Sequence, residues 1–204
     1  MLMTHVHISY GVSKLGADIP SVSLPVGCTC RPDAPCFRKC YGRRGRFAIS
    51  RTKALIQNNL ELWCCEPEQY ERDVAIAAFR SRFFRWHCTG DIPDAKYLEM
   101  MIRVARNLES TRFLCFTKKF ELVNQRIDAF GALPANLNMV FSAWGAFLPD
   151  NPHALPVAYI RFRNQPADIP DNAYHCPKYC GNCVMSGESC WDLKLGEAVC
   201  FDEH

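Results

Sequence analysis

Hydrophobic and polar positions follow two periods in turn along most of the chain, which predicts alternating helices and strands. Good helix formers fill residues 51–63, and this helix is expected to end before Pro67. Apolar residues recur at helical spacing in three later segments, the last of which is expected to stop at Gly131. Their apolar positions are Tyr70, Val74, Ala77 and Ala78; Leu98, Met101, Ile102 and Ala105; and Phe120, Val123, Ile127 and Phe130.

Short apolar runs separate these helices and predict buried strands. The runs lie at 83–88, 112–116, 137–141 and 157–162, and one or two further strands are expected near 22–26. Strands joined through helices need crossover connections, so we expect an α/β fold with a largely parallel sheet or a partial (β/α) barrel. A complete eight-stranded barrel typically needs about 250 residues, more than the 204 of this chain.

The end of the chain departs from this pattern. Residues 173–191 have neither period and are rich in cysteine, so we expect residues 173–204 to form a Cys-rich, metal-binding cap on an α/β core of residues 1–172. A chain of 204 residues is long enough for one core and short for two, and no long Pro/Gly-rich linker divides it. The sequence therefore predicts a single domain overall.

Composition and charge narrow the class of protein. Charged residues make up 22% of the chain, which argues against wholesale disorder, and a net charge of +3 is too small to indicate a nucleic-acid binder by itself. No apolar run approaches the length of a membrane span, and the first residues do not have the pattern of a signal peptide. We therefore expect a cytoplasmic protein without membrane association.

Thirteen cysteines are a large excess for such a chain. In a reducing cytosol cysteines are retained for metal binding or catalysis, so the count favours a metalloprotein. The other interpretation is a structural protein stapled by disulfides, which would bind no metal and would leave at least one cysteine unpaired.

The first group of cysteines is Cys30, Cys36 and Cys40, spaced C-x5-C-x3-C, with Cys28 beside it. Three thiolates from one loop can bind three irons of a [4Fe-4S] cluster and leave the fourth iron open to a cofactor or substrate. If Cys28 is a fourth ligand, the site is closed and would hold a structural or electron-transfer cluster, or tetrahedral zinc. The remaining alternative is a loop of ordinary free thiols.

A basic segment, residues 31–53, surrounds this group and contains a single acid, Asp33. Its cations are Arg31, Arg38, Lys39, Arg43, Arg44, Arg46, Arg51 and Lys53. They are able to offset the charge of thiolates, to attract a phosphate or carboxylate group, or to contact nucleic acid or a host protein. A solvated basic surface is an equally good interpretation.

The second group is Cys176, Cys180, Cys183 and Cys190, spaced C-x3-C-x2-C-x6-C, and it is the strongest signal in the sequence. Four thiolates this close can surround one zinc ion or one complete [4Fe-4S] cluster. The sequence does not separate a structural metal site from an electron-transfer or catalytic cluster.

Polar residues follow three of the predicted strands, where ligands bind in parallel α/β folds. The predicted cofactor-binding residues are Gly90, Asp91, Thr117, Lys118 and Ser142. The alternative is that Asp91 and Asp94 cap the next helix and that Lys118 is solvated. Cys88 and Cys115 fall inside apolar strands and are expected to be core residues.

Several segments together carry a resemblance to a known family. They are Ala-Pro-Cys-Phe-Arg-Lys-Cys-Tyr at 34–41, Arg-Trp-His-Cys-Thr-Gly-Asp at 85–91, Phe-Thr-Lys-Lys at 116–119 with Val-Asn at 123–124, Phe-Ser-Ala-Trp at 141–144, and Cys-Trp at 190–191 with Gly-Glu at 196–197. In combination, and over nearly the whole chain, they resemble the phage gene product 88 family. The resemblance implies a phage or prophage gene whose product acts in the cytoplasm of a bacterial host.

The order of these motifs is also similar, more distantly, to that of phage proteins of radical S-adenosylmethionine type. This similarity implies an open [4Fe-4S] cluster at Cys30, Cys36 and Cys40, with S-adenosylmethionine as cofactor. The second group would then hold an auxiliary cluster. The leading hypothesis is such an enzyme with one or two [4Fe-4S] clusters. The alternative is a non-enzymatic iron–sulfur or zinc protein that binds nucleic acid or a host protein through the basic segment.

Overall fold

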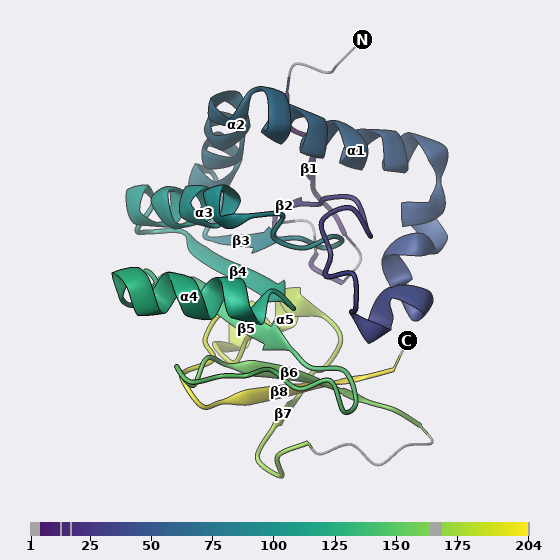
Figure 1. Ribbon diagram of the computed structural model, residues 1–204, viewed down its shortest axis with the longest axis vertical. Coiled ribbons are helices and arrows are strands. Elements are labelled where there is room, and N and C mark those ends of the chain that lie inside the picture. Colours follow the sequence, from purple (N-terminus) through teal and green to yellow (C-terminus); the bar gives the residue numbers. More distant parts are fainter. Residues whose placement is uncertain (1–4, 13, 17, 164–168, 204) are drawn as a thin grey trace.

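An open sheet of eight strands organises the computed structural model, which describes residues 5–12, 14–16, 18–163 and 169–203 (Figure 1). The strand order is β1-β2-β3-β4-β5-β6-β8-β7. β1 is antiparallel to β2, and the other pairings are parallel, so the expected α/β fold with a largely parallel sheet is confirmed. The strands are β1 (Ile8–Ser9), β2 (Ser21–Val22), β3 (Phe83–Trp86), β4 (Arg112–Thr117), β5 (Leu137–Ser142), β6 (Val157–Arg161), β7 (Tyr174–His175) and β8 (Ala198–Asp202).

The four predicted helices are present, and two of their ends have the expected chemistry. Asp94 caps α3 by accepting a hydrogen bond of 2.9 Å from the backbone N–H of Tyr97, and Gly131, at a φ of 79°, ends α4. The α-helices are α1 (Ser50–Cys65), α2 (Pro67–Phe79), α3 (Ala95–Asn107), α4 (Phe120–Phe130) and α5 (Cys180–Ser186). Three short 3₁₀ helices, η1 (Pro35–Lys39), η2 (Tyr41–Arg43) and η3 (Gly45–Ala48), carry part of the first cysteine group.

The alternation of side chains along the strands creates two separate cores. In β4, Phe113 and Cys115 pack on one face, whereas Leu114 and Phe116 pack on the other. Helices α1 to α4 all contribute to the first core, and Figure 1 shows α2, α3 and α4 stacked along this face of the sheet. The helices therefore leave the second face of the sheet to other parts of the chain.

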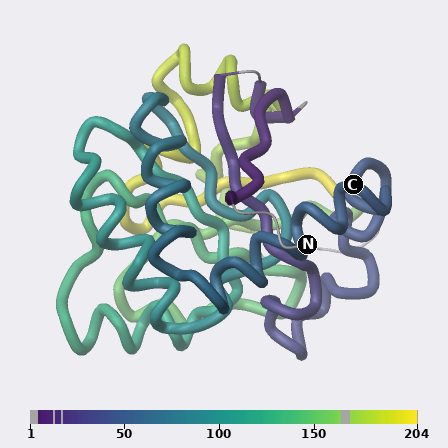
Figure 2. The backbone as a smooth tube through the Cα atoms, turned by 90° about the horizontal axis from the view of Figure 1, so that it is seen from above, coloured from purple at the N-terminus to yellow at the C-terminus, as the bar shows by residue number. Residues whose placement is uncertain are grey.

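Segments from both ends of the chain cover this second face. Its core includes Leu15 and Ile19 from the N-terminal region and Cys176 and Trp191 from the C-terminal region. The C-terminal residues also lie beside η1 to η3, as Figures 1 and 2 show, and Lys39 forms an ion pair of 3.0 Å with Glu203 there. The two ends of the sequence thus meet on the side of the sheet opposite the four long helices.

The structure corrects two details of the prediction. Residues 173–204 are more than a cap on the core, because they supply β7, α5 and β8, and two of these elements are strands of the sheet itself. β7 has only two residues and is recognised through its pairing with β8, which has five. The run at 83–88 ends as a strand at Trp86, since His87 has a φ of 53° and interrupts the extended backbone.

Candidate functional site

A cavity of about 460 Å³ lies on the second face of the sheet, and both cysteine groups line it. Cys36 and Cys40 of the first group reach it from η1 and the residue that follows η1. All four cysteines of the second group line it: Cys176, Cys180, Cys183 and Cys190. Two groups that are far apart in the sequence therefore share one space.

Cys30 is close to this space without lining it. Burial raises the pKa of its thiol, and the charges of Asp91, Cys40 and Cys36 raise it further. The three cysteines of the predicted C-x5-C-x3-C group are thus near enough to influence one another electrostatically. We regard the three as one group at the edge of the cavity.

The first cysteine loop is attached to the body of the protein by polar contacts. Arg31 forms ion pairs of 2.7 Å with both Asp33 and Glu121, the second of which lies in α4. The hydroxyl of Tyr41 donates to the backbone carbonyl of Cys88, directly after the end of β3. These contacts hold the loop across the carboxyl ends of the strands.

The second group is held by hydrogen bonds to the sheet and to the N-terminal segment. The backbone N–H of Cys176 donates to the carbonyl of Cys200 (2.9 Å), and that of Cys180 donates to the carbonyl of Lys14 (2.8 Å). The side-chain amide of Asn138 donates to the carbonyl of Cys190 at 2.8 Å. These three contacts fix the backbone. Two thiols also have side-chain contacts: the sulfur of Cys176 accepts from the backbone N–H of Lys178 at 3.4 Å, and that of Cys183 lies 3.9 Å from the hydroxyl of Tyr174.

Burial is the main influence on the ionisation of these thiols. It raises the pKa of Cys36 and Cys180 and raises the pKa of Cys190 to about 12. Nearby cations act in the opposite direction, Lys118 on Cys36 and Arg85 on both Cys180 and Cys190. The thiols of Cys36, Cys180 and Cys190 are therefore protonated at neutral pH unless a bound metal displaces the protons.

No group of three or more His, Cys, Asp or Glu side chains among the described residues is arranged to hold a single metal ion. The metal-binding character expected for the Cys-rich segment is therefore not shown by the structure. A tetrahedral zinc ion needs all its thiolates about 2.3 Å from one point. A [4Fe-4S] cluster distributes its cysteines over four irons, which requires a wider set of sulfur atoms.

Two of the five predicted cofactor-binding residues face the cavity. Lys118 follows β4 and Ser142 ends β5, and both line the cavity wall. The ammonium group of Lys118 donates to the hydroxyl of Ser142 at 2.7 Å. Together they place a cation and a hydroxyl on the wall where the carboxyl ends of these two strands meet.

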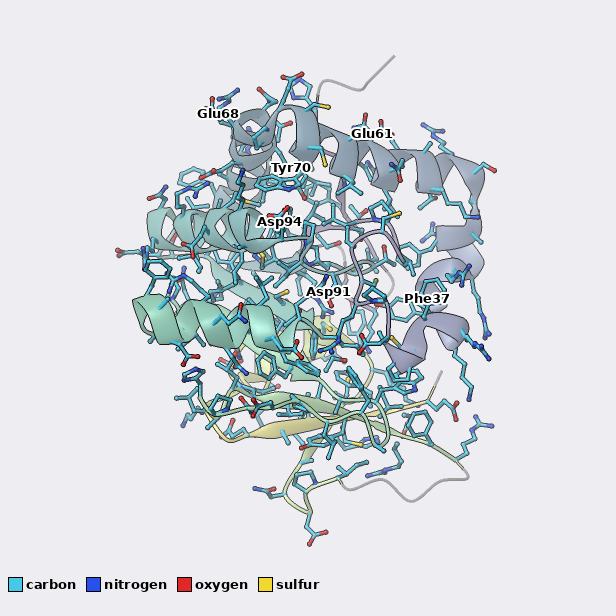
Figure 3. The ribbon with its side chains drawn as sticks, viewed as in Figure 1. Phe37, Glu61, Glu68, Tyr70, Asp91 and Asp94 are labelled. Atoms are coloured by element: carbon cyan, nitrogen blue, oxygen red, sulfur yellow. The ribbon has the colours of Figure 1, made fainter. Side chains whose placement is uncertain are left out.

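The other three predicted residues, Gly90, Asp91 and Thr117, do not line the cavity. Asp91 is buried and labelled in Figure 3, and its carboxylate accepts hydrogen bonds from the Thr117 hydroxyl (2.6 Å) and from the backbone N–H groups of Ile92 (2.8 Å) and Lys118 (2.9 Å). Its own backbone N–H donates to the hydroxyl of Thr29 in the first cysteine loop. Asp91 thus joins the ends of β3 and β4 to that loop.

Gly90 has a packing role beside it. Its φ is 78°, and a Cβ atom at this position would lie 2.5 Å from the backbone oxygen of Leu24. The absence of a side chain therefore allows the chain after β3 to approach the segment after β2.

Sequence reasoning missed several residues that line the cavity. Arg85 lies in β3 between apolar neighbours, and Lys14 and Tyr41 come from segments without a clear pattern. Cys88 is buried as expected, yet it also lines the cavity, whereas Cys115 lies in the core beneath the helices. The one available signal was Arg85, because a charged residue inside a short apolar strand needs a special environment.

Some cations of the basic segment 31–53 contact other side chains, and others are exposed to solvent. Besides the ion pairs of Arg31 and Lys39, the guanidinium group of Arg43 lies 4.6 Å from the centre of the Phe37 ring. Arg38, Arg44, Arg46, Arg51 and Lys53 are exposed. The segment therefore presents a basic surface outside the cavity.

All thirteen cysteines lie among the described residues, and all are free thiols. The structure thus contains no disulfide of the kind that a stapled protein would need. Among the helices of the described residues, none is both long and apolar enough to cross a membrane.

Comparison with known proteins identifies the family. Searches of curated proteins and of solved structures find no match to the chain. The gene product 88 family model matches residues 7–172, a range that contains the first cysteine group and ends before the second. Nothing in these comparisons supports the more distant similarity to radical S-adenosylmethionine proteins. The motifs at 190–191 and 196–197 also lie beyond the matched range. The chain belongs to the gene product 88 family of phage proteins.

Proposed function

We propose that this protein is an iron–sulfur protein that holds one or two [4Fe-4S] clusters at its cavity. The single observation that carries the proposal is the meeting of both cysteine groups around one space. In this proposal Cys30, Cys36 and Cys40 bind at one end of the cavity. The other ligands are Cys176, Cys180, Cys183 and Cys190.

The surroundings of the thiols support a cluster over a single ion. Six cysteines line the cavity, Cys36 and Cys40 from the first group and all four of the second, whereas one tetrahedral zinc ion uses at most four thiolates. Arg85 and Lys118 lower the proton affinity of neighbouring thiols and would offset the negative charge of a ligated cluster. Zinc remains the alternative metal, and metal analysis separates the two.

The finer form of the proposal is an enzyme resembling the radical S-adenosylmethionine type. A three-cysteine cluster supplies an open iron that is able to bind a cofactor and deliver an electron. This chain's own residues would do the positioning, because Lys118 and Ser142 present polar groups on the cavity wall while Leu114 and Phe116 keep the wall apolar.

Metal analysis of protein purified without oxygen from iron-replete cells tests the proposal. We expect a brown protein with iron and acid-labile sulfide. Replacing all three cysteines of the first group by serine should remove part of the iron, and replacing all four of the second group should remove the rest. The matched control is the pair Cys64→Ser and Cys65→Ser, at the exposed end of α1, which should keep the full iron content. A colourless wild-type protein, with zinc alone or no metal, rejects the proposal.

The enzymatic form has a separate test. After reduction, the protein is incubated with S-adenosylmethionine, and the formation of 5′-deoxyadenosine is measured. Cleavage should require the first cysteine group. If the iron-loaded protein does not cleave S-adenosylmethionine, the enzymatic form of the proposal is rejected and the iron–sulfur proposal is kept.

The exposed arginines favour one alternative, a non-enzymatic protein that binds nucleic acid or a host protein. Arg38, Arg44 and Arg46 are exposed in the basic segment. In this case binding to DNA or RNA should weaken steeply with added salt. Replacement of these three arginines by glutamine should weaken binding without altering the iron content.

A further inference from the structure

The cavity contains cations that form no ion pair with the described residues. Lys14, Arg85 and Lys118 line it, and none of them forms an ion pair within the described part of the chain. Two acids, Asp202 and Glu203, also line it, but each has a cation of its own. Asp202 pairs with His175 and Lys178, and Glu203 pairs with Lys39.

Arg85 and Lys118 each have side-chain hydrogen-bond donors that make no hydrogen bond to the described residues. The Nε atom of Arg85 donates to the carbonyl of Trp86 at 3.0 Å, and its guanidinium carbon lies 4.3 Å from the centre of the Phe116 ring. The two terminal nitrogens of this guanidinium make no hydrogen bond to the described residues. Lys118 uses one of its three donors on Ser142.

The pairing of the strands places the side chains of Arg85 and Lys118 on the cavity side of the sheet. Arg85 pairs with Leu114 across β3 and β4, and Thr117 pairs with Phe141 across β4 and β5. Side chains two residues apart on a strand share a face, so Leu114, Phe116 and Lys118 point to the cavity side. The ring of Phe116 therefore lies between the level of Arg85 and that of Lys118.

The rest of the wall is largely apolar. Leu114, Phe116, Trp144, Ile160, Phe201 and Trp191 line the cavity. Cations beside such a surface lose hydration, and an anion that pairs with them recovers the lost free energy. A volume of about 460 Å³ is within the usual range for small-molecule sites.

We propose that the cavity binds a small molecule that has a carboxylate or phosphate group on an apolar body. Arg85 and Lys118 hold the anionic group, and the aromatic wall around Phe116 and Trp144 holds the body. The inference rests on the proposed function only in that ligand and cluster would share this cavity. The inference goes beyond the proposed function because it names the chemical class of the ligand and gives Arg85 a role in binding it.

Calorimetric titration with three matched probes tests the proposal: naphthoate, naphthyl phosphate and the uncharged naphthamide. The protein is purified without oxygen, and its iron content is measured in the same sample. At least one anionic probe should bind about tenfold more tightly than naphthamide, since a charge-assisted contact is worth about one decade or more in affinity. Equal affinity for charged and uncharged probes would overturn the proposal.

Variants locate the anion within the cavity. Arg85→Gln and Lys118→Met should each weaken the anionic probe about tenfold and leave naphthamide unchanged. Lys53→Gln, in the exposed basic segment, should alter neither. If Arg85→Gln does not fold, Arg85→Lys keeps a cation without the planar fork and should retain intermediate affinity. Wild-type affinity in folded Arg85 and Lys118 variants would also overturn the proposal.

The outcomes separate this inference from the iron–sulfur proposal. Anion binding by a protein without iron would reject the cluster and keep the ligand site. An iron-loaded protein that discriminates no anion would show that the cations serve only as counter-charges to the cluster, and the inference would then fail alone.

Discussion

At the scale of single residues, buried polar groups determine how the strand ends are held. Asp91 has three donors to its carboxylate, and His87 lies in the helix-side core with its Nε2 atom 3.1 Å from the hydroxyl of Tyr97. Tyr97 in turn shares a hydrogen bond of 2.6 Å with Tyr70. Groups of this kind stabilise the fold only while every partner is present.

Replacement of Asp91 by alanine should destabilise the protein strongly. Three donors would lose their acceptor in a buried site, which should lower the free energy of unfolding by at least about 3 kcal/mol. Urea denaturation measures this change. Asp94→Ala is the control, because the loss of a helix cap should cost about 1 kcal/mol. A folded Asp91→Ala protein with unchanged stability would contradict this structural role of Asp91.

His87 should make the protein sensitive to acid. Burial lowers its pKa to about 3, with a further contribution from Arg85, whereas an unfolded histidine has a pKa of about 6.5. Between these values the unfolded state binds a proton that the folded state does not. Stability should therefore fall as the pH decreases from about 6.5 toward 3, by up to about 1.4 kcal/mol per pH unit.

Denaturation curves across this pH range check the effect of His87. In His87→Asn this part of the pH dependence should disappear, and asparagine tolerates the positive φ at this position. A variant with the same acid sensitivity as the wild type would assign the effect to other groups.

At the scale of elements, the second cysteine segment is held to the sheet by its neighbour Trp191. This side chain is buried, its Nε1 donates to the carbonyl of Phe84 at 3.2 Å, and its ring meets that of Phe83 edge to face. Arg112 adds a hydrogen bond of 3.0 Å to the carbonyl of Trp191. Trp191 therefore adds an aromatic anchor to the hydrogen bonds that Cys200, Lys14 and Asn138 make with this segment.

Trp191→Ala should cost about 3–5 kcal/mol and loosen residues 173–191 more than the helices. Hydrogen exchange followed by mass spectrometry reads the two regions separately. The control is Leu195→Ala, at an exposed position in the same part of the chain, which should change stability by less than about 0.5 kcal/mol. Uniform loosening of the whole protein would contradict a local anchor.

At the scale of the whole molecule, the cavity joins the two ends of the chain across one face of the sheet. A group bound there would contact both ends at once and would favour the folded state, because the unfolded chain does not assemble the site. The four long helices on the other face do not take part in this contact.

Removal of bound metal should therefore lower the melting temperature and expose the two cysteine segments to protease. Calorimetry and limited proteolysis of the loaded and chelator-treated proteins measure both effects. Cleavage should begin near residues 28–48 and 173–191, while α1 to α4 stay protected. Identical melting temperatures and cleavage patterns would show that no stabilising group is bound at the cavity.

Local periodicity by itself determined four helices and four main strands, and cysteine spacing determined the two cysteine groups, because these patterns depend on near neighbours. Only the tertiary structure decided that the two groups share one cavity, that Asp91 is enclosed by its own donors, and that Arg85 joins Lys118 on the wall. β7 and β8 were likewise missed. β7 has two residues, too few to form a pattern, whereas the apolar run at 198–201 in the five-residue β8 was a local signal of a strand. Strand order and the face that each side chain occupies arise from contacts between distant segments, and no local pattern encodes them.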